Sequence, residues 1–334
     1  MDASRTRSLV TGGAGFIGSH LVERLLARGD DVTVIDNFST GSRENLVHLD
    51  SERMTCIDGT VAEVLSACEP DQWDEIYHLA AAVGVRLVIE RPIHTIETNI
   101  EETSVVLRYA THGRPRVLIA SSSEVYGKGT KTPFHEDDDV LYGPTIFSRW
   151  SYACSKAIDE YLALAYAGQH ALPVVVARFF NTVGPRQIGN YGMVLPRFVD
   201  AALRGEPLTV HGDGLQTRCF CDVRDVVRLL PQLIESEGAH GRVVNVGNDT
   251  PISILDLART VIDTLDSSSE VQLVPYDEAF GEGFDDLRVR QPDLTRLRAL
   301  TSFAPAWSLD ATIHAIADDQ RRAASATPSG GERP

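Results

Sequence analysis

The stretch Thr11-Gly12-Gly13-Ala14-Gly15-Phe16-Ile17-Gly18 decides the fold of this chain. Its glycines satisfy two overlapping patterns, Gly12-x-x-Gly15-x-x-Gly18 and Gly13-x-Gly15-x-x-Gly18. Apolar residues then recur at helical spacing until Gly29, and the strand-like run Val32-Thr33-Val34-Ile35 closes on Asp36. This β-turn-α-β unit of about thirty residues, with an acidic residue at its end, is the context that a dinucleotide-binding fingerprint requires.

The alternation of strand and helix continues through the first half of the chain. Apolar, β-branched runs predict further strands at 54–58, 75–80, 116–121 and 173–179. Helical patterns lie between them, one over about 95–110 and another that carries Tyr152 and Lys156. Strands that alternate with helices indicate an α/β fold of the Rossmann type, a doubly wound parallel sheet.

The composition of the sequence changes after about residue 180, where glycine, proline and arginine become frequent. We expect residues 1–180 to form the dinucleotide-binding domain, with returns to it near 220–247. We expect residues 181–322 to form mainly a smaller C-terminal α/β substrate domain. Residues 323–334 are polar and rich in Ser, Gly and Pro, and are predicted to be a disordered tail.

Composition excludes several classes of protein. Of the 334 residues, 43% are hydrophobic and 23% are charged, as in globular domains, and no apolar run reaches 18 residues. A formal net charge of −16 disfavours a nucleic-acid partner, so we expect neither nucleic acid nor membrane as partners. The five cysteines have no zinc-like spacing, and the acidic run 136–139 is predicted to be a solvated loop, so no metal site is expected. The N-terminus has no secretory segment, which favours a cytoplasmic location.

The glycine tract predicts a site for a dinucleotide. Small residues let backbone N–H groups approach a pyrophosphate at the start of a helix. Asp36 suits the ribose hydroxyls of NAD and would repel the 2′-phosphate of NADP, so the predicted cofactor is NAD. Asp58, at the end of the next strand, is either a contact to the adenine or an ordinary turn residue.

A second set of residues predicts acid–base chemistry. The tract Ser121-Ser122-Ser123-Glu124-Val125-Tyr126-Gly127 follows a buried strand, so its hydroxyls and carboxylate emerge at the sheet edge where ligands bind. Tyr152 and Lys156 are four residues apart and share one helix face. A lysine ammonium there favours tyrosinate and lowers the pKa of the tyrosine, which then accepts a proton during hydride transfer from a sugar alcohol.

These motifs as a set resemble those of extended short-chain dehydrogenases/reductases that act on nucleotide sugars. The resemblance runs from about Ser8 to Leu309 and includes Arg178-Phe179-Phe180-Asn181, Gly212-Asp213-Gly214 and Arg290-Gln291-Pro292-Asp293. In that family, bound NAD oxidises C4 of the sugar, and the keto intermediate is then epimerised, dehydrated or decarboxylated. The resemblance also implies a homodimer that pairs through helices like the one carrying Tyr152.

The residues after the catalytic serine favour one branch of the family. The 4,6-dehydratases carry an Asp-Glu pair where this chain has Ser123-Glu124, and plain 4-epimerases usually lack the Glu. The Ser-Glu pair is similar to that of the UDP-glucuronic acid decarboxylases, which form UDP-xylose or a UDP-4-keto-pentose. A UDP-sugar 4-epimerase is the nearest alternative, followed by a 4,6-dehydratase, a UDP-apiose synthase and a non-catalytic NAD-sensing regulator. Glu124 remains a puzzle, because its charge would face a substrate carboxylate.

The resemblance also implies roles for individual residues. The predicted catalytic residues are Ser122, Glu124, Tyr152, Lys156 and Arg218, the last as a proton donor. The predicted cofactor-binding residues are Gly12, Gly15, Phe16, Ile17, Gly18, Asp36, Asn37, Asp58, Leu79, Ala80, Ala81, Asn99, Tyr152, Lys156 and Val183. The predicted residues for the UDP-sugar are Arg86, Ser123, Asn181, Thr209, Arg218 and Arg290, the two last as arginine clamps for the diphosphate.

Overall fold

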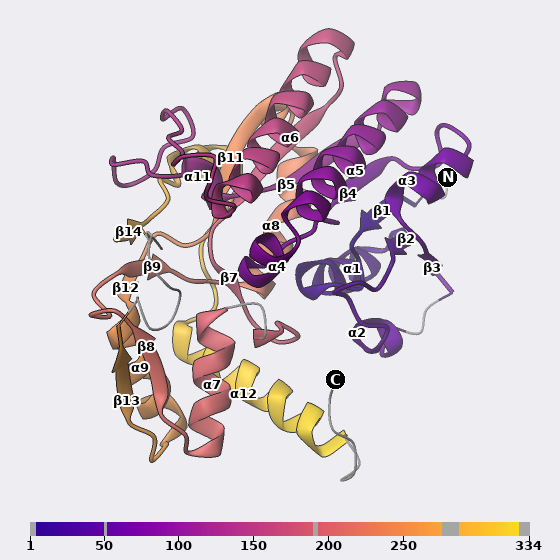
Figure 1. Cartoon of the computed structure of the whole chain (residues 1–334). Coiled ribbons are helices and arrows are strands. Elements are labelled where there is room, and N and C mark those ends of the chain that lie inside the picture. Colours follow the sequence, from indigo (N-terminus) through magenta and orange to yellow (C-terminus); the bar gives the residue numbers. More distant parts are fainter. Residues whose placement is uncertain (1–4, 50–51, 190–192, 276–286, 327–334) are drawn as a thin grey trace.

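A seven-stranded sheet forms the centre of the first domain (Figure 1). The computed structural model describes residues 5–49, 52–189, 193–275 and 287–326. The strand order is β11-β6-β5-β4-β1-β2-β3, and every pair is parallel. The strands are β1 (Arg7–Thr11), β2 (Asp31–Asp36), β3 (Met54–Asp58), β4 (Glu75–His78), β5 (Arg116–Ser122), β6 (Val174–Phe179) and β11 (Arg242–Val246). The predicted doubly wound parallel sheet is confirmed.

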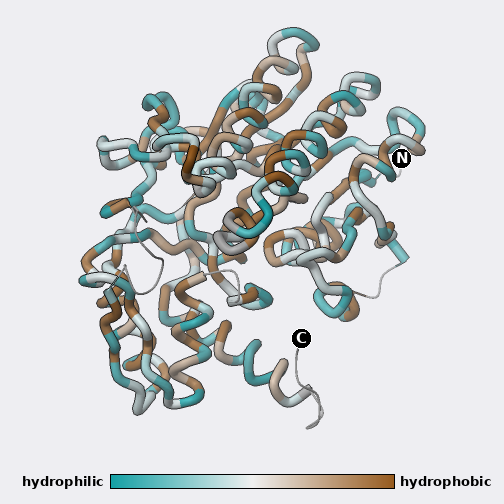
Figure 2. Tube along the Cα trace, in the orientation of Figure 1, coloured by the Kyte–Doolittle hydropathy of each residue, from teal (hydrophilic) through white to brown (hydrophobic). Residues whose placement is uncertain are grey.

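Helices cover both faces of this sheet because its strands are apolar on both sides. In β1, Leu9 packs into the core beneath α5 and α6, while its neighbour Val10 packs into the core beneath α1 and α8. Brown, apolar segments accordingly run through the middle of the sheet in Figure 2. The helices are α1 (Phe16–Arg28), α2 (Glu44–Val47), α3 (Val61–Ala67), α4 (Val85–Glu90), α5 (Pro92–Gly113), α6 (Arg149–His170) and α8 (Val223–Glu235).

A smaller domain lies beside the carboxyl edge of the sheet, with its own apolar core between helices α7, α9 and α12 (Figure 1). Its helices are α7 (Val194–Arg204), α9 (Ile254–Leu265) and α12 (Leu309–Ala326). Helix α11 (Thr295–Leu300) packs against β11 of the large sheet, and short 3-10 turns η1 (Ser123–Tyr126) and η3 (Glu237–Ala239) lie elsewhere in the chain. Its strands are β7 (Thr182–Val183), β8 (Leu208–His211), β9 (Thr217–Cys219), β10 (Cys221–Asp222), β12 (Pro251–Ser253), β13 (Val271–Val274) and β14 (Val289–Arg290).

The chain returns to the first domain more than once. Strand β11 is the last strand of the large sheet, and α8 packs against α1. Leu294, Leu297 and Phe303 also belong to the core beneath α1 and α8, so the return extends beyond residue 247. Helix α12 continues to Ala326, so residues 323–326 are helical where a disordered tail was predicted, and residues 327–334 lie outside the described residues.

Other predicted boundaries differ in ways that bear on the site. Strand β4 ends at His78 and not at Ala80, while β5 continues through Ser122. Helix α5 starts at Pro92, a residue with a preset φ that suits a first helical turn. Glu136 is buried and its Oε1 accepts the N–H of Asn245 at 2.9 Å, so the prediction of a solvated acidic loop is wrong for that residue.

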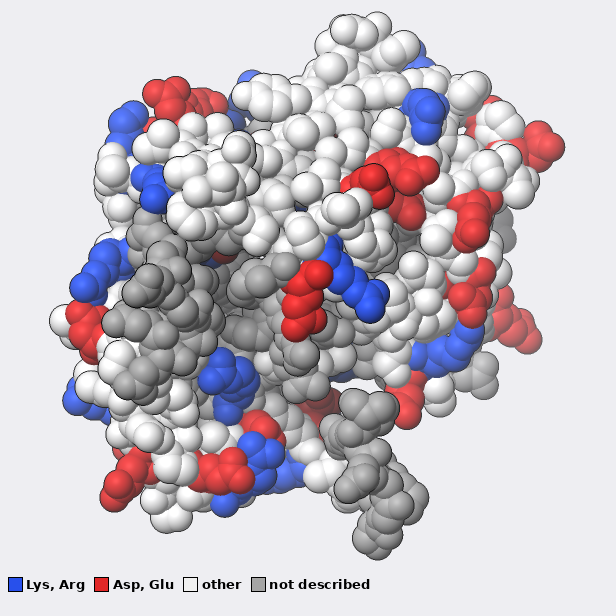
Figure 3. All heavy atoms as spheres, in the orientation of Figure 1, with Lys and Arg blue, Asp and Glu red and all other residues white. Residues whose placement is uncertain are grey.

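The distribution of surface charge and the character of the helices also bear on the partners of the protein. On the face drawn in Figure 3, the lysines and arginines of the described residues lie scattered among acidic side chains. Among the described residues, no helix combines the length and the apolar character needed to cross a bilayer.

Candidate active site

The glycine turn lies at the point where the strand order reverses, between β1 and β4. Gly12 has φ 68°, and a Cβ on it would lie 2.8 Å from the backbone N of Ala80, so β4 leaves no room for a side chain. A Cβ on Gly18 would lie 2.1 Å from the carbonyl oxygen of Gly12. Helix α1 begins directly after Gly15, which provides no side-chain cap, so the first amides of Phe16 and Ile17 keep the donor capacity that a pyrophosphate uses.

Asp36 ties the glycine turn to the end of β2. It is 7% exposed, and its two oxygens accept the N–H groups of Ala14 and Phe38, each at 2.8 Å. A carboxylate has about four lone-pair sites, so two remain for hydroxyl donors. The residue therefore both shapes the turn and retains capacity for a ribose.

Asp58 and Asn37 make local contacts at this edge. Asp58 is exposed, and its carboxylate pairs with Arg43 at 2.5 Å. The guanidinium of Arg43 also lies 4.0 Å from the ring centre of Phe38, and Asn37 accepts the N–H of Ser39. Arg43 was missed by sequence reasoning because it lies in no motif. The structure gives Asp58 a specific partner, which neither reading of the sequence included.

The end of β4 is fixed by two neighbouring side chains. The N–H groups of Leu79 and Ala80 donate to the carbonyl and hydroxyl oxygens of Thr11. Asn99, buried in α5, accepts the N–H of Ala82 at 2.8 Å and donates to the Ser155 hydroxyl at 3.2 Å. Asn99 thus positions the loop through Ala81 that faces the predicted cofactor. Arg86 lies in α4, and its side chain is outside the described residues.

Ser122 and Tyr152 are brought together from β5 and α6. The Ser122 hydroxyl oxygen accepts the N–H of Glu124 at 3.2 Å, and this bond starts the 3-10 turn η1 in which Ser123 is buried. Burial of the Tyr152 phenol raises its pKa, the Glu124 carboxylate raises it further, and the hydrogen bond with Ser122 lowers it. The serine and the tyrosine therefore contact each other, in a setting that holds the tyrosine neutral.

Lys156 lies one turn beyond Tyr152, as predicted, but its partner is different. Its Nζ donates to Asp159 Oδ2 at 2.8 Å, and both side chains are almost fully buried. The sequence predicts a lysine that lowers the pKa of Tyr152. In the structure the ammonium pairs with Asp159, and burial dominates, so the pKa of Tyr152 is raised.

The two predicted arginine clamps occupy neighbouring strands with different partners. Arg290 in β14 and Arg218 in β9 are opposite each other in register. Arg290 Nη1 donates to Glu124 Oε1 at 2.5 Å, with the arginine side chain 10% exposed. Arg218 Nη1 donates to the carbonyl oxygens of Thr217 and Leu287. Sequence reasoning missed the contact between Arg290 and Glu124, which joins residues 166 positions apart.

The remaining predicted residues lie where the two domains meet or in the second domain. The carbonyl of Asn181 accepts the N–H of Cys221, and Val183 follows in β7, buried, with β10 as its neighbour. Thr209 lies in β8, half-buried.

A buried network that the sequence reasoning missed supports the serine tract from behind. Arg178 donates to both oxygens of Glu160, at 2.8 and 2.6 Å, and the Ser121 hydroxyl donates to the same carboxylate. Glu160 follows Tyr152 by eight residues, so one helix face carries both, and this spacing was a usable signal.

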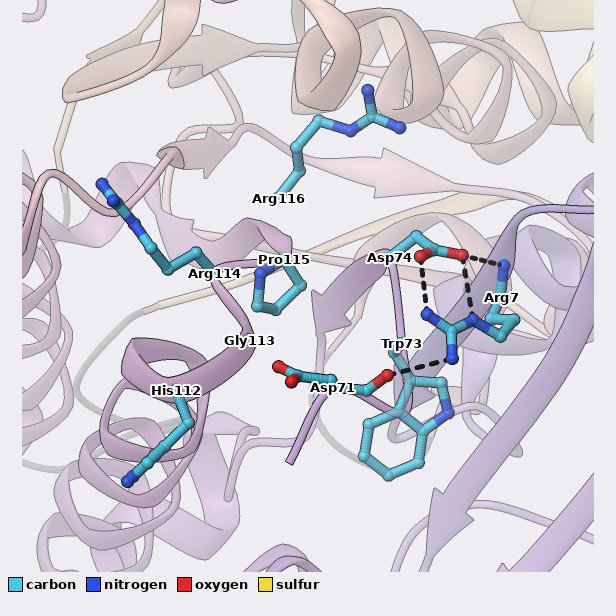
Figure 4. A pocket seen from close by; sticks show the side chains of 9 residues that line it. All are labelled: Arg7, Asp71, Trp73, Asp74, His112, Gly113, Arg114, Pro115 and Arg116. Atoms are coloured by element: carbon cyan, nitrogen blue, oxygen red, sulfur yellow. Dashed lines mark hydrogen bonds and ion pairs between the residues drawn. The ribbon is translucent and has the colours of Figure 1, made fainter. Parts of the chain in front are cut away.

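The cavity in Figure 4 lies at the opposite edge of the sheet, where β1 and β5 begin. Its volume is about 430 Å³, and its lining includes Arg7, Arg114 and Arg116. Arg7 pairs with Asp74 at 2.8 Å and Arg116 with Glu75 at 2.7 Å. Arg114 donates to the backbone carbonyl of Ala171, so all three cations are engaged, and none of the residues predicted for the site lines this cavity.

Comparisons with known proteins agree with this geometry. Residues 8–247 match the NAD dependent epimerase/dehydratase family. The chain is 43% identical to UDP-N-acetyl-alpha-D-glucosaminuronate decarboxylase of Bacillus cytotoxicus, covering 90% of this chain and 93% of the relative. It is 38% identical to UDP-glucuronic acid decarboxylase 4 of Arabidopsis thaliana, covering 95% and 69%. A solved structure of UDP-glucuronic acid 4-epimerase from Bacillus cereus, with UDP-glucuronic acid and NAD, has a TM-score of 0.82 and 27% identity, covering 95% and 99%.

Proposed function

Because the chain belongs to the NAD-dependent epimerase/dehydratase family, we propose that it is an NAD-dependent decarboxylase of a UDP-linked uronic acid. The cofactor is NAD, and the residues fit it. Backbone amides at Phe16 and Ile17 would hold the pyrophosphate, and Asp36 would hold the adenosine ribose.

In the first step, oxidation at C4 of the sugar, different residues of the chain have different roles. The chemistry that NAD would supply when bound is reversible uptake of the hydride from C4 of the sugar. Only the tyrosinate form of Tyr152 accepts the proton of the C4 hydroxyl, and Ser122 holds the oxygen from which that proton leaves. Lys156 supplies the positive charge one helical turn away.

The same residues hold the substrate while carbon dioxide leaves. Once C4 is a ketone, the C6 carboxyl group is that of a β-keto acid. The C5–C6 bond breaks, its electron pair passes into the ketone that Ser122 and Tyr152 hold, and the enolate then takes a proton at C5. As the family resemblance implies, we take Arg218 as the donor of that proton; its Nη1 is held by two backbone carbonyls, on the strand next to Arg290. Hydride return gives UDP-pentose, and release before it gives the 4-keto sugar.

The observation that carries the proposal is the ion pair between Arg290 and Glu124. Two bare carboxylates repel each other, which would exclude a uronic acid from a site that contains Glu124. The guanidinium offsets that charge, so a second carboxylate is admitted at this edge. The pair also bears on the puzzle of Glu124, because the guanidinium offsets the negative charge that would face a substrate carboxylate.

Two substrates are supported, UDP-glucuronate and UDP-N-acetylglucosaminuronate. The second is favoured by the relative that is 43% identical over 90% of this chain. Purified protein incubated with each UDP-uronic acid and analysed by mass spectrometry tests both. Loss of one carbon dioxide from either substrate supports the proposal, and conserved substrate mass with both would favour the alternative of a 4-epimerase and contradict it.

We also propose a homodimer and a cytoplasmic location. Ile158 and Tyr161, three residues apart on α6, expose 42% and 70% of their surface, and Ile93 at the start of the adjacent α5 is also exposed. Apolar side chains on adjacent long helices suit a helix-to-helix contact between two copies. All five cysteines are free, which suits a reducing compartment.

A further inference from the structure

One face of α6 carries three ionisable side chains in sequence. Tyr152, Lys156 and Asp159 occupy positions i, i+4 and i+7, which fall on the same side of a helix. We call this line of Tyr152, Lys156 and Asp159 on one helix face the stripe. Asp159 lies at its far end, one turn beyond Lys156 from the tyrosine. No motif in the sequence singled it out.

Asp159 is the acidic partner of Lys156 among the described residues. The Nζ–Oδ2 distance is 2.8 Å, and the two side chains are 3% and 0% exposed. An ammonium this deeply buried needs a paired anion to stay charged. Burial raises the pKa of Asp159, and the charge of Lys156 and the Thr103 side chain oppose that shift.

The other charged groups near the stripe are already engaged or neutral. Glu160 is held by Arg178, and Glu124 pairs with Arg290. His78, from β4, is buried between the hydroxyls of Thr11 and Thr103, and burial together with the charge of Lys156 lowers its pKa to about 3. The imidazole carries no negative charge that could balance the Lys156 ammonium. Among these groups, Asp159 is therefore the counter-ion of Lys156.

The ion pair of Lys156 and Asp159 could be purely structural, but it lies on the helix face that also carries Tyr152. Asp159 acts on both members of the catalytic pair, since it holds the ammonium of Lys156 and its charge also reaches the Tyr152 phenol. Lys156 is one turn from the tyrosine and Asp159 two turns. The ammonium favours tyrosinate and the carboxylate opposes it, so the role inferred for Asp159 is to act through the lysine that it holds.

We propose that Asp159 is a positioning residue for the reaction, whose carboxylate keeps the Lys156 ammonium charged and fixed beside Tyr152. Only the catalytic consequence rests on the proposed function. Without the carboxylate, the buried ammonium has no counter-ion and its neutral form is favoured. The tyrosine then loses its cationic neighbour, and proton transfer slows.

The chain's composition makes a direct test practicable. It contains three lysines, Lys128, Lys131 and Lys156, so protein labelled with ¹³C at the lysine ε carbon gives three signals whose shifts report charge. Lys156→Met identifies the signal of interest. In the unaltered protein we expect that signal to keep the shift of a charged ammonium at pH 8. A neutral Lys156 at that pH would overturn the proposal without any variant of Asp159.

Asp159→Asn is the informative substitution. We expect its Lys156 signal to titrate at least one pH unit lower, a tenfold change in proton affinity, and the rate of NAD reduction by substrate at 340 nm to fall at least tenfold at pH 7. Asp159→Glu keeps the carboxylate and should restore the titration in part. Asp318→Asn, which breaks an exposed i,i+3 pair on α12, is the matched control and should change neither readout. An unmoved Lys156 titration in Asp159→Asn refutes the role. Because the titration needs no substrate, it is decided separately from the proposed decarboxylation.

Discussion

The most direct test of the cofactor site is to add one methyl group to the glycine turn. A Cβ on Gly18 would lie 2.1 Å from the carbonyl oxygen of Gly12 and 2.8 Å from the Cα of Gly13. Cβ atoms do not approach other heavy atoms closer than 3.0 Å, so the backbone must separate by at least 0.9 Å. Overpacking of this kind typically costs about 1–3 kcal/mol. The displaced backbone is the segment whose amides face the pyrophosphate, so Gly18→Ala should weaken NAD binding as well as stability.

The two effects can be measured apart. Ligand at 100 times its Kd stabilises a protein by about 2.7 kcal/mol, which urea unfolding with and without NAD detects. We expect the unaltered protein to show this increment and Gly18→Ala to lose most of it, and calorimetric titration gives the NAD affinity directly.

A matched control lies in α6, where Gly168 is exposed and a Cβ would meet nothing within 4 Å. Gly168→Ala should leave NAD binding unchanged and raise stability by about 0.5–1 kcal/mol, because alanine loses less entropy in a helix. NAD binding by Gly18→Ala at the unaltered affinity would refute the assignment of the turn.

Three further predictions concern the chemistry and the assembly. Glu124→Gln removes a charge that raises the pKa of Tyr152, so the acidic limb of the pH profile for NAD reduction at 340 nm should move to lower pH; a shift to higher pH would contradict this. Tyr152→Phe should reduce turnover by about 10²–10⁴-fold while bound NAD, measured after denaturation, is retained; unchanged turnover would remove the tyrosine from the mechanism. Changing Ile158 and Tyr161 together to Glu should convert a dimer into monomers in light scattering, and an unchanged mass would exclude this face as the interface.

The sheet could be predicted from the sequence because its signals are local. The glycine turn, the apolar strands and Asp36 all lie within short windows whose spacing follows from helix and strand geometry. The end of β4 was less certain, since Leu79 and Ala80 continue the apolar run. Their N–H groups bond to Thr11, on a different strand, and that long-range contact fixes the end of β4.

The sequence predicted which residues form the candidate site, but not which charged side chains pair with one another there. Tyr152, Lys156 and Ser122 each belong to a motif with a fixed spacing. Their charged partners do not. Asp159 is buried where α5 and β5 pack against α6, and a sequence does not reveal which of two adjacent acids, Asp159 or Glu160, faces the lysine.

The contact between Arg290 and Glu124 shows why such pairings matter for the choice of substrate. At about 4 Å and an effective dielectric constant of 20, two like charges repel by about 4 kcal/mol, enough to keep a uronic acid out. The guanidinium of Arg290 offsets the negative charge of Glu124, which would otherwise repel the carboxylate of the substrate. A site that contained the glutamate alone would favour neutral sugars. Acceptance of an acidic sugar therefore depends on a residue of the second domain, 166 positions from the serine tract, and no motif around Ser122 would have revealed it.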